Sequence, residues 1–76
     1  MNQQDSRRQY GRIRMWNDER GFGFVVPENG NVASYFLHAS QIPEDQRTQI
    51  QVGVFVEFTP LKKDKGWTAV NVSVAK

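Results

Sequence analysis

The sequence predicts an all-β fold: a five-stranded antiparallel sheet closed into a barrel. Short runs rich in β-branched and aromatic residues alternate with clusters of Gly, Asn, Asp and Pro, which is the pattern of strands joined by turns. The chain has 76 residues and no cysteine, so packing alone must stabilise one small core. Closing a short sheet into a barrel removes its exposed edges, and a barrel is therefore favoured.

The first two strands have clear ends. The first covers about residues 10–16 and stops at the polar, turn-forming residues 17–19. The second, residues 22–26, stops at Pro27, which has no N–H to donate to a sheet, and the Asn-Gly pair at residues 29–30 is a strong signal for a tight turn. These signals predict two strands, each followed by a turn.

The rest of the chain contains three further predicted strands: residues 34–38, 54–58 and 67–74. Residues 41–51 are polar, include Pro43 and have no helical stripe of apolar residues, so we expect a long loop with room for one helical turn. The lysine-rich residues 62–66 are expected to form another loop.

Composition bounds the domain organisation and the class of function. We expect one domain, residues 10–76, after a flexible polar tail, residues 1–9. That tail has no apolar stretch, and no later segment is long and apolar enough to span a membrane, so we expect a cytoplasmic protein without a membrane partner. One histidine and no cysteine offer no grouping of acid, base and nucleophile. We therefore expect no enzyme, no small-molecule substrate, no metal and no cofactor.

Positive charge is modest in sum but unevenly distributed. The formal net charge is +2, which is too small to bind nucleic acid by charge alone. Arginines gather in the first quarter of the chain: Arg7, Arg8, Arg12, Arg14 and Arg20. A second cluster, Lys62, Lys63 and Lys65, is interpreted as a solvated loop that adds diffuse attraction.

Alternation along the strands predicts which side chains fill the barrel. The inward set is Ile13, Met15, Val25, Tyr35, Leu37, Val54, Val56, Phe58, Val70, Val72 and Val74. The opposite face then carries Arg12, Arg14, Trp16, Phe22, Phe24, Phe36 and His38. So short a chain cannot bury both faces of its sheet, and an exposed apolar patch usually marks a binding site.

Rings interleaved with arginines suit single-stranded nucleic acid, because unpaired bases stack on rings while guanidinium groups meet phosphates. Gly21 and Gly23 would let the second strand bend and let a ligand approach. Three alternatives stay open. The phenylalanines could be core residues, a bulge could turn Trp16 inward, or the face could bind a protein partner or a second copy.

Several segments resemble the cold-shock domain family. Residues 20–25, Arg-Gly-Phe-Gly-Phe-Val, resemble its first ribonucleoprotein motif, and residues 35–38, Tyr-Phe-Leu-His, with Ser40, resemble the second. Residues 11–17 are similar to the opening strand of the family, and residues 66–72 to its closing strand.

This resemblance implies an OB-fold barrel that binds single-stranded RNA or DNA, often as an RNA chaperone. It assigns binding to Arg14, Trp16, Phe22, Phe24, Phe36 and His38, and to these we add Arg12 and Arg20. We expect a monomer.

Three positions depart from the family pattern. Met15 stands in place of a base-stacking tryptophan, Ala39 in place of an aromatic residue after the histidine, and Arg47 near a loop phenylalanine. These departures predict weaker or shifted binding. Trp67, where the family often has a small residue or proline, is a candidate to restore a stacking platform at the edge.

Overall fold

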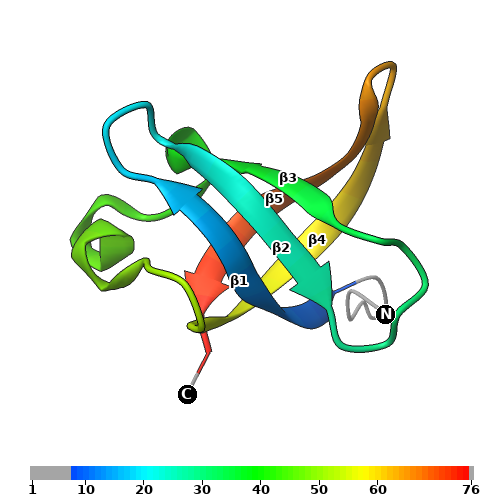
Figure 1. Ribbon diagram of the computed structural model, residues 1–76, viewed down its shortest axis with the longest axis horizontal. Coiled ribbons are helices and arrows are strands. Elements are labelled where there is room, and N and C mark those ends of the chain that lie inside the picture. Colours follow the sequence, from blue (N-terminus) through cyan, green and yellow to red (C-terminus); the bar gives the residue numbers. More distant parts are fainter. Residues whose placement is uncertain (1–7, 76) are drawn as a thin grey trace, which may run out of the picture.

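The computed structural model describes residues 8–75, and these form a closed barrel with the strand order β1-β2-β3-β5-β4 (Figure 1). The strands are β1 (Gln9–Asn17), β2 (Phe22–Pro27), β3 (Tyr35–His38), β4 (Phe55–Lys63) and β5 (Gly66–Val74). All five predicted strands are present. Neighbours pair antiparallel except β3 and β5, which run parallel over a short ladder.

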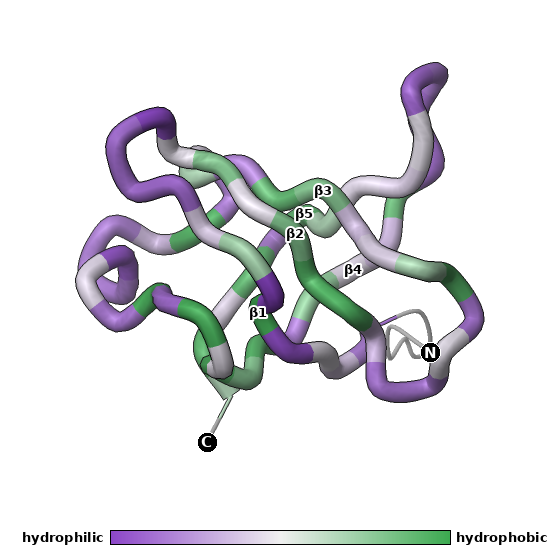
Figure 2. Tube along the Cα trace, in the orientation of Figure 1, coloured by the Kyte–Doolittle hydropathy of each residue, from purple (hydrophilic) through white to green (hydrophobic). Residues whose placement is uncertain are grey.

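The core is built by alternation along the strands, as predicted for most positions. The buried apolar residues are Ile13, Val25, Tyr35, Leu37, Ile42, Ile50, Val56, Phe58, Ala69 and Val72. At its centre the rings of Tyr35 and Phe58 lie 4.9 Å apart between centroids. Val54 and Val74 are half-buried against this core, and Val70 is half-buried as well. Figure 2 shows apolar segments along the strands and hydrophilic turns at the periphery.

The segment expected to be a long loop contains two short 3-10 helices, η1 (Ala39–Gln41) and η2 (Glu44–Gln49). The residue after each helix, Ile42 and Ile50, is buried in the core. Sequence patterning missed both because two isoleucines eight positions apart form neither a strand nor a helix stripe. None of the helices among residues 8–75 is long and apolar enough to cross a membrane.

The predicted loop at residues 62–66 is instead the end of a β-hairpin. β4 continues to Lys63 and β5 begins at Gly66, with Lys62 opposite Trp67 and Lys63 opposite Gly66. Gly66 has a φ of 129°, which suits glycine at this tight turn. The hairpin projects beyond the barrel (Figure 1), with Lys62 and Lys63 on β4 and Lys65 in the turn.

A β-bulge interrupts the pairing of β1 with β2. Ile13 lies opposite Val25, but Met15 lies opposite Phe24, so β1 carries one extra residue. Beyond the bulge each β1 side chain points to the face opposite to the one that simple alternation predicts. The prediction that Met15 lies in the core is therefore wrong: its side chain is 38% exposed.

The predicted tail, residues 1–9, lies mostly outside the described residues, and Arg7 with it. Its last two residues belong to the fold. Gln9 opens β1, and Arg8 Nε pairs with Glu57 Oε2 at 3.2 Å. Arg8 Nη1 also donates to the carbonyl oxygen of Asn71 at 2.6 Å. These contacts tie the start of β1 to β4 and β5.

Candidate nucleic-acid interface

Strand pairing brings the outward-facing rings of β2 and β3 together in two rows across the sheet. In the first row Met15 lies opposite Phe24, Phe24 opposite Phe36, and Phe36 opposite Thr68, so the row crosses β1, β2, β3 and β5. In the second row Asn17 lies opposite Phe22, and Phe22 opposite His38. We call Met15, Phe22, Phe24, Phe36 and His38 the aromatic face.

The three phenylalanines form one cluster rather than isolated rings. Phe36 is the hub: its ring centroid lies 5.9 Å from that of Phe22, nearly parallel at 26°, and 5.9 Å from that of Phe24, edge-on at 72°. Phe36 is 36% exposed although it belongs to a sheet with a complete core beneath it. The alternative that these rings are core residues is therefore wrong, because Tyr35, Leu37 and Val25 fill the inner face.

Trp16 does not lie on the aromatic face, which corrects its predicted placement. The bulge puts Trp16 opposite Gly23, on the inner side, where its ring packs against the core while remaining half-exposed. Its Nε1 donates to Asp18 Oδ1 at 3.4 Å. Met15 takes the outer position beside Phe24 instead. The bulge alternative raised for Trp16 is the one that the structure adopts.

Gly23 also has a different role from the one predicted. It is buried, and an added Cβ would collide with the carbonyl oxygen of Met15 and lie 2.7 Å from Cε3 of Trp16. Glycine at this position makes room for the bulge rather than for a ligand. Gly21 has a φ of 73° in the turn before β2, a conformation that favours glycine.

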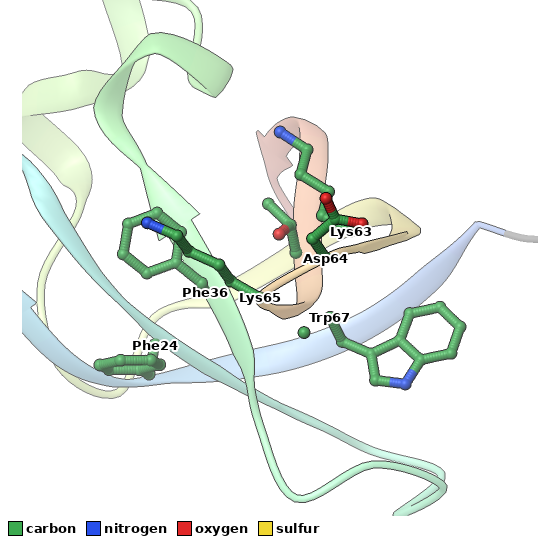
Figure 3. A pocket seen from close by; sticks show the side chains of 8 residues that line it. Phe24, Phe36, Lys63, Asp64, Lys65 and Trp67 are labelled. Atoms are coloured by element: carbon green, nitrogen blue, oxygen red, sulfur yellow. The ribbon is translucent and has the colours of Figure 1, made fainter.

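The β4–β5 hairpin adds lysines that sequence analysis assigned to a solvated loop. Lys63 and Lys65 line an open depression of about 950 Å³ together with Phe24 and Phe36, and Thr68 forms part of its wall (Figure 3). Cationic side chains beside exposed rings can meet phosphates while bases stack. These lysines were missed because their position depends on the hairpin, which no local signal predicted.

Trp67 belongs to the same hairpin but not to the ring cluster. Its indole points away from Phe24 and Phe36 (Figure 3). It contacts the ring of Tyr35 edge-on at a centroid distance of 5.8 Å, and Lys62 Nζ lies 5.7 Å from its centroid. Trp67 thus packs the hairpin against β3. It also lines the same depression as Phe24 and Phe36, although no direct ring contact joins it to them.

His38 is oriented by its neighbour Ser40. The backbone N–H of Ser40 donates to His38 Nδ1 at 3.0 Å, and the Ser40 hydroxyl lies 2.9 Å from the same nitrogen. Because Nδ1 accepts a hydrogen bond, a neutral ring carries its proton on Nε2. The exposed edge of His38 is then a donor at the end of the second row.

The three predicted arginines lie at the edges of the aromatic face. Arg14 and Met15 line one small depression with Phe24, and Arg20 is exposed in the turn that leads into β2. Arg12 is farther away: its guanidinium lies 4.5 Å from the centroid of Phe55 on β4. The structure thus places Arg14 beside the rings and Arg12 beyond them.

Two of the family departures reshape the end of the face near His38. Ala39 presents no ring there. Arg47 Nε donates to the carbonyl oxygen of Ile42 at 3.3 Å, and its side chain lines a depression with Trp16 and Asp18. The phenylalanine cluster therefore lies on β2 and β3, between Arg14 and the lysines Lys63 and Lys65.

A small closed barrel with an exposed, cation-flanked ring cluster on its β2 and β3 strands defines an OB-fold protein of the nucleic-acid-binding type. Comparison with known proteins gives the family. Residues 9–75 match the family described as the "Cold-shock" DNA-binding domain, and the chain belongs to this family. The resemblance found in the motifs is thereby confirmed, and the protein has a nucleic-acid-binding function of the cold-shock type.

Individual relatives are similar over nearly the whole chain. Cold shock protein CapB of Pseudomonas syringae pathovar tomato is 36% identical, covering 91% of this chain and 97% of that protein. The major cold shock protein CspA of Pseudomonas aeruginosa is 38% identical with the same coverage. The solved structure titled "drosophila Unr CSD456" matches with a TM-score of 0.74 at 25% identity. It covers 91% of this chain, which spans 27% of that longer chain.

Proposed function

We propose that the protein binds single-stranded RNA or DNA on the aromatic face, as a monomer in the cytoplasm, and acts as an RNA chaperone. The observation that carries this proposal is the row Met15, Phe24, Phe36, which crosses three strands. Arg14 lies at one end of the row, and Lys63 and Lys65 lie at the other. A strand laid along this row would stack its bases on the rings and meet cations at both ends.

Binding is expected to depend on stacking more than on charge. Each stacked base contributes about 1–3 kcal/mol, so three rings are sufficient for useful affinity although the net charge is only +2. Bases in a duplex are already stacked and paired, and cannot lie on the rings. The protein therefore selects unpaired strands and pulls a pairing equilibrium toward the open form by mass action, without catalysis.

The test is a titration of a labelled oligothymidine of about five nucleotides, within the range of one OB-fold. Fluorescence anisotropy of the label is preferable to tryptophan quenching, because neither Trp16 nor Trp67 lies on the aromatic face. Phe24→Ala and Phe36→Ala should each weaken binding at least about fivefold, since each removes one stacking ring. A matching duplex should bind far more weakly than the single strand.

Phe55→Thr is the matched control, because Phe55 is exposed to nearly the same extent as Phe36, 38% against 36%, but lies on β4 away from the rows. Equal losses from Phe36→Ala and Phe55→Thr on this short strand would contradict the proposal. Absence of single-strand binding together with a doubled mass in solution would favour the rival function, a protein interface on the same face.

A further inference from the structure

A second exposed patch lies on the outer face of the barrel where β1 pairs with β4. Arg12 is directly opposite Phe55, and Tyr10 is opposite Glu57 two residues along. Tyr10 is 52% exposed and Phe55 38%. Neither aromatic residue belongs to the two rows described above. We call Tyr10, Arg12 and Phe55 the β1–β4 patch.

Electrostatics of this patch favour an anionic ligand. The guanidinium of Arg12 lies over the Phe55 ring, 4.5 Å from its centroid, an arrangement that restrains the side chain and leaves its N–H groups available. Among residues 8–75, neither Arg12 nor Arg14 has a carboxylate partner, whereas the neighbouring Glu57 is neutralised by Arg8. Glu28 is the one carboxylate that shares the adjoining depression with the two arginines among the described residues.

The β1–β4 patch is continuous with the aromatic face through Arg14. Arg14 lines the depression that contains Met15 and Phe24, and it also lines the depression that contains Arg12 and Phe55. Met15 and Arg12 are three residues apart on β1, which corresponds to about 10 Å along a strand. A nucleic-acid strand that leaves the first row over Met15 would thus reach Arg14 and then Arg12.

We propose that the β1–β4 patch is an additional subsite that binds the continuation of the same single strand. Arg12, held over Phe55, receives a phosphate or offers its guanidinium plane to a base, and Arg14 bridges the two regions. This inference rests on the proposed function and adds a second region to its footprint. It makes the patch selective for strand length: short strands are held by the rings alone, and longer strands engage both regions.

The experiment compares oligothymidines of about five and about twelve nucleotides on the unaltered chain, Arg12→Gln and Phe55→Thr. Both variants should bind the shorter strand as the unaltered chain does and should weaken the longer strand at least about threefold. Arg12→Gln should also lower the salt slope for the longer strand by about 0.7, the value for one lost phosphate contact on a single strand. Lys62→Gln is the charge-matched control, because Lys62 lies over Trp67 rather than along this path.

The outcomes separate this inference from the proposed function. Length-selective losses in both variants, absent in Lys62→Gln, would support the subsite. Unchanged binding of the longer strand, or equal weakening of both strands, would overturn the subsite while leaving the aromatic face intact. Failure of the unaltered chain to bind either strand would refute the proposed function itself. A dimer that Phe55→Thr dissociates would assign the patch to a second copy of the chain instead.

Discussion

Met15 is the residue at which the aromatic face is least complete. It lies opposite Phe24 on the outer side of the bulge and is 38% exposed, yet it offers a flexible thioether where a ring would extend the first row. A thioether provides no flat surface on which a base could stack. The first row therefore ends in a weak platform next to Arg14.

Met15→Trp should consequently increase affinity for short single strands. A new stacking ring is worth about 1–3 kcal/mol, so we expect roughly tenfold tighter binding, measured by anisotropy with the oligothymidine of the proposed test. Met15→Leu is the control and should leave affinity unchanged, because it alters the apolar side chain without adding a ring. Equal affinity of the two variants would show that this end of the row does not contact bases.

The β1 bulge is the element that decides which β1 side chains lie on the aromatic face. Ile13 faces the core, and the extra residue then moves Met15 to the outer face and Trp16 to the inner side against Gly23. Without the bulge, Trp16 would lie outward and Met15 would point into the core. The composition of the aromatic face thus depends on one irregularity in pairing.

Gly23→Ala tests this dependence. Its methyl group would meet the Met15 carbonyl oxygen and the Trp16 ring, so the bulge must shift. Overpacking of this kind costs about 1–3 kcal/mol, and we expect the free energy of unfolding in urea to fall by that amount. Short-strand affinity should fall as well, because the first row loses its alignment.

Gly30→Ala provides a useful contrast, since nothing lies within 4 Å of an added Cβ there, although its φ of 71° disfavours alanine. It should lower stability modestly through backbone strain alone and leave strand binding unchanged. An unaffected affinity in Gly23→Ala would mean that the bulge does not align the ligand-binding row.

At the scale of the whole molecule, closure of the barrel gives the inner and outer faces of one sheet different roles. The inner face supplies the core, and Ile42 and Ile50 from the helical segment complete it. The outer face is then free to carry rings whose burial the fold does not need. One glutamine from each 3-10 helix attaches this segment to β5: Gln41 Oε1 accepts from the Asn71 N–H, and Gln46 Oε1 accepts from the Val74 N–H.

The proposed selection of unpaired bases predicts passive opening of weak duplexes. In a labelled RNA hairpin, protein at about 100 times its dissociation constant should favour the open form by about 2.7 kcal/mol per occupied site. The melting temperature should fall steadily with protein concentration and without nucleotide hydrolysis. The chain that carries both Phe24→Ala and Phe36→Ala is the control and should leave the melting temperature of the RNA hairpin unchanged. A melting temperature that rises with protein concentration would contradict the chaperone role.

Sequence alone determined the five strands, the closed barrel and most of the core, because these depend on local alternation and on turn residues. It also predicted correctly that Phe22, Phe24, Phe36 and His38 lie on the outer face of the sheet, since these positions follow regular alternation on β2 and β3. The family motifs in these strands gave the same assignment independently.

Tertiary structure decided what depends on contacts between distant segments. Pairing with β2 introduced the bulge that exchanges Met15 and Trp16. Pairing of β4 with β5 built the hairpin that carries Lys63 and Lys65 to the rings and directs Trp67 toward Tyr35. Pairing of β1 with β4 joined Arg12 to Phe55. No local pattern encodes these arrangements, because register and long-range packing are properties of two strands together.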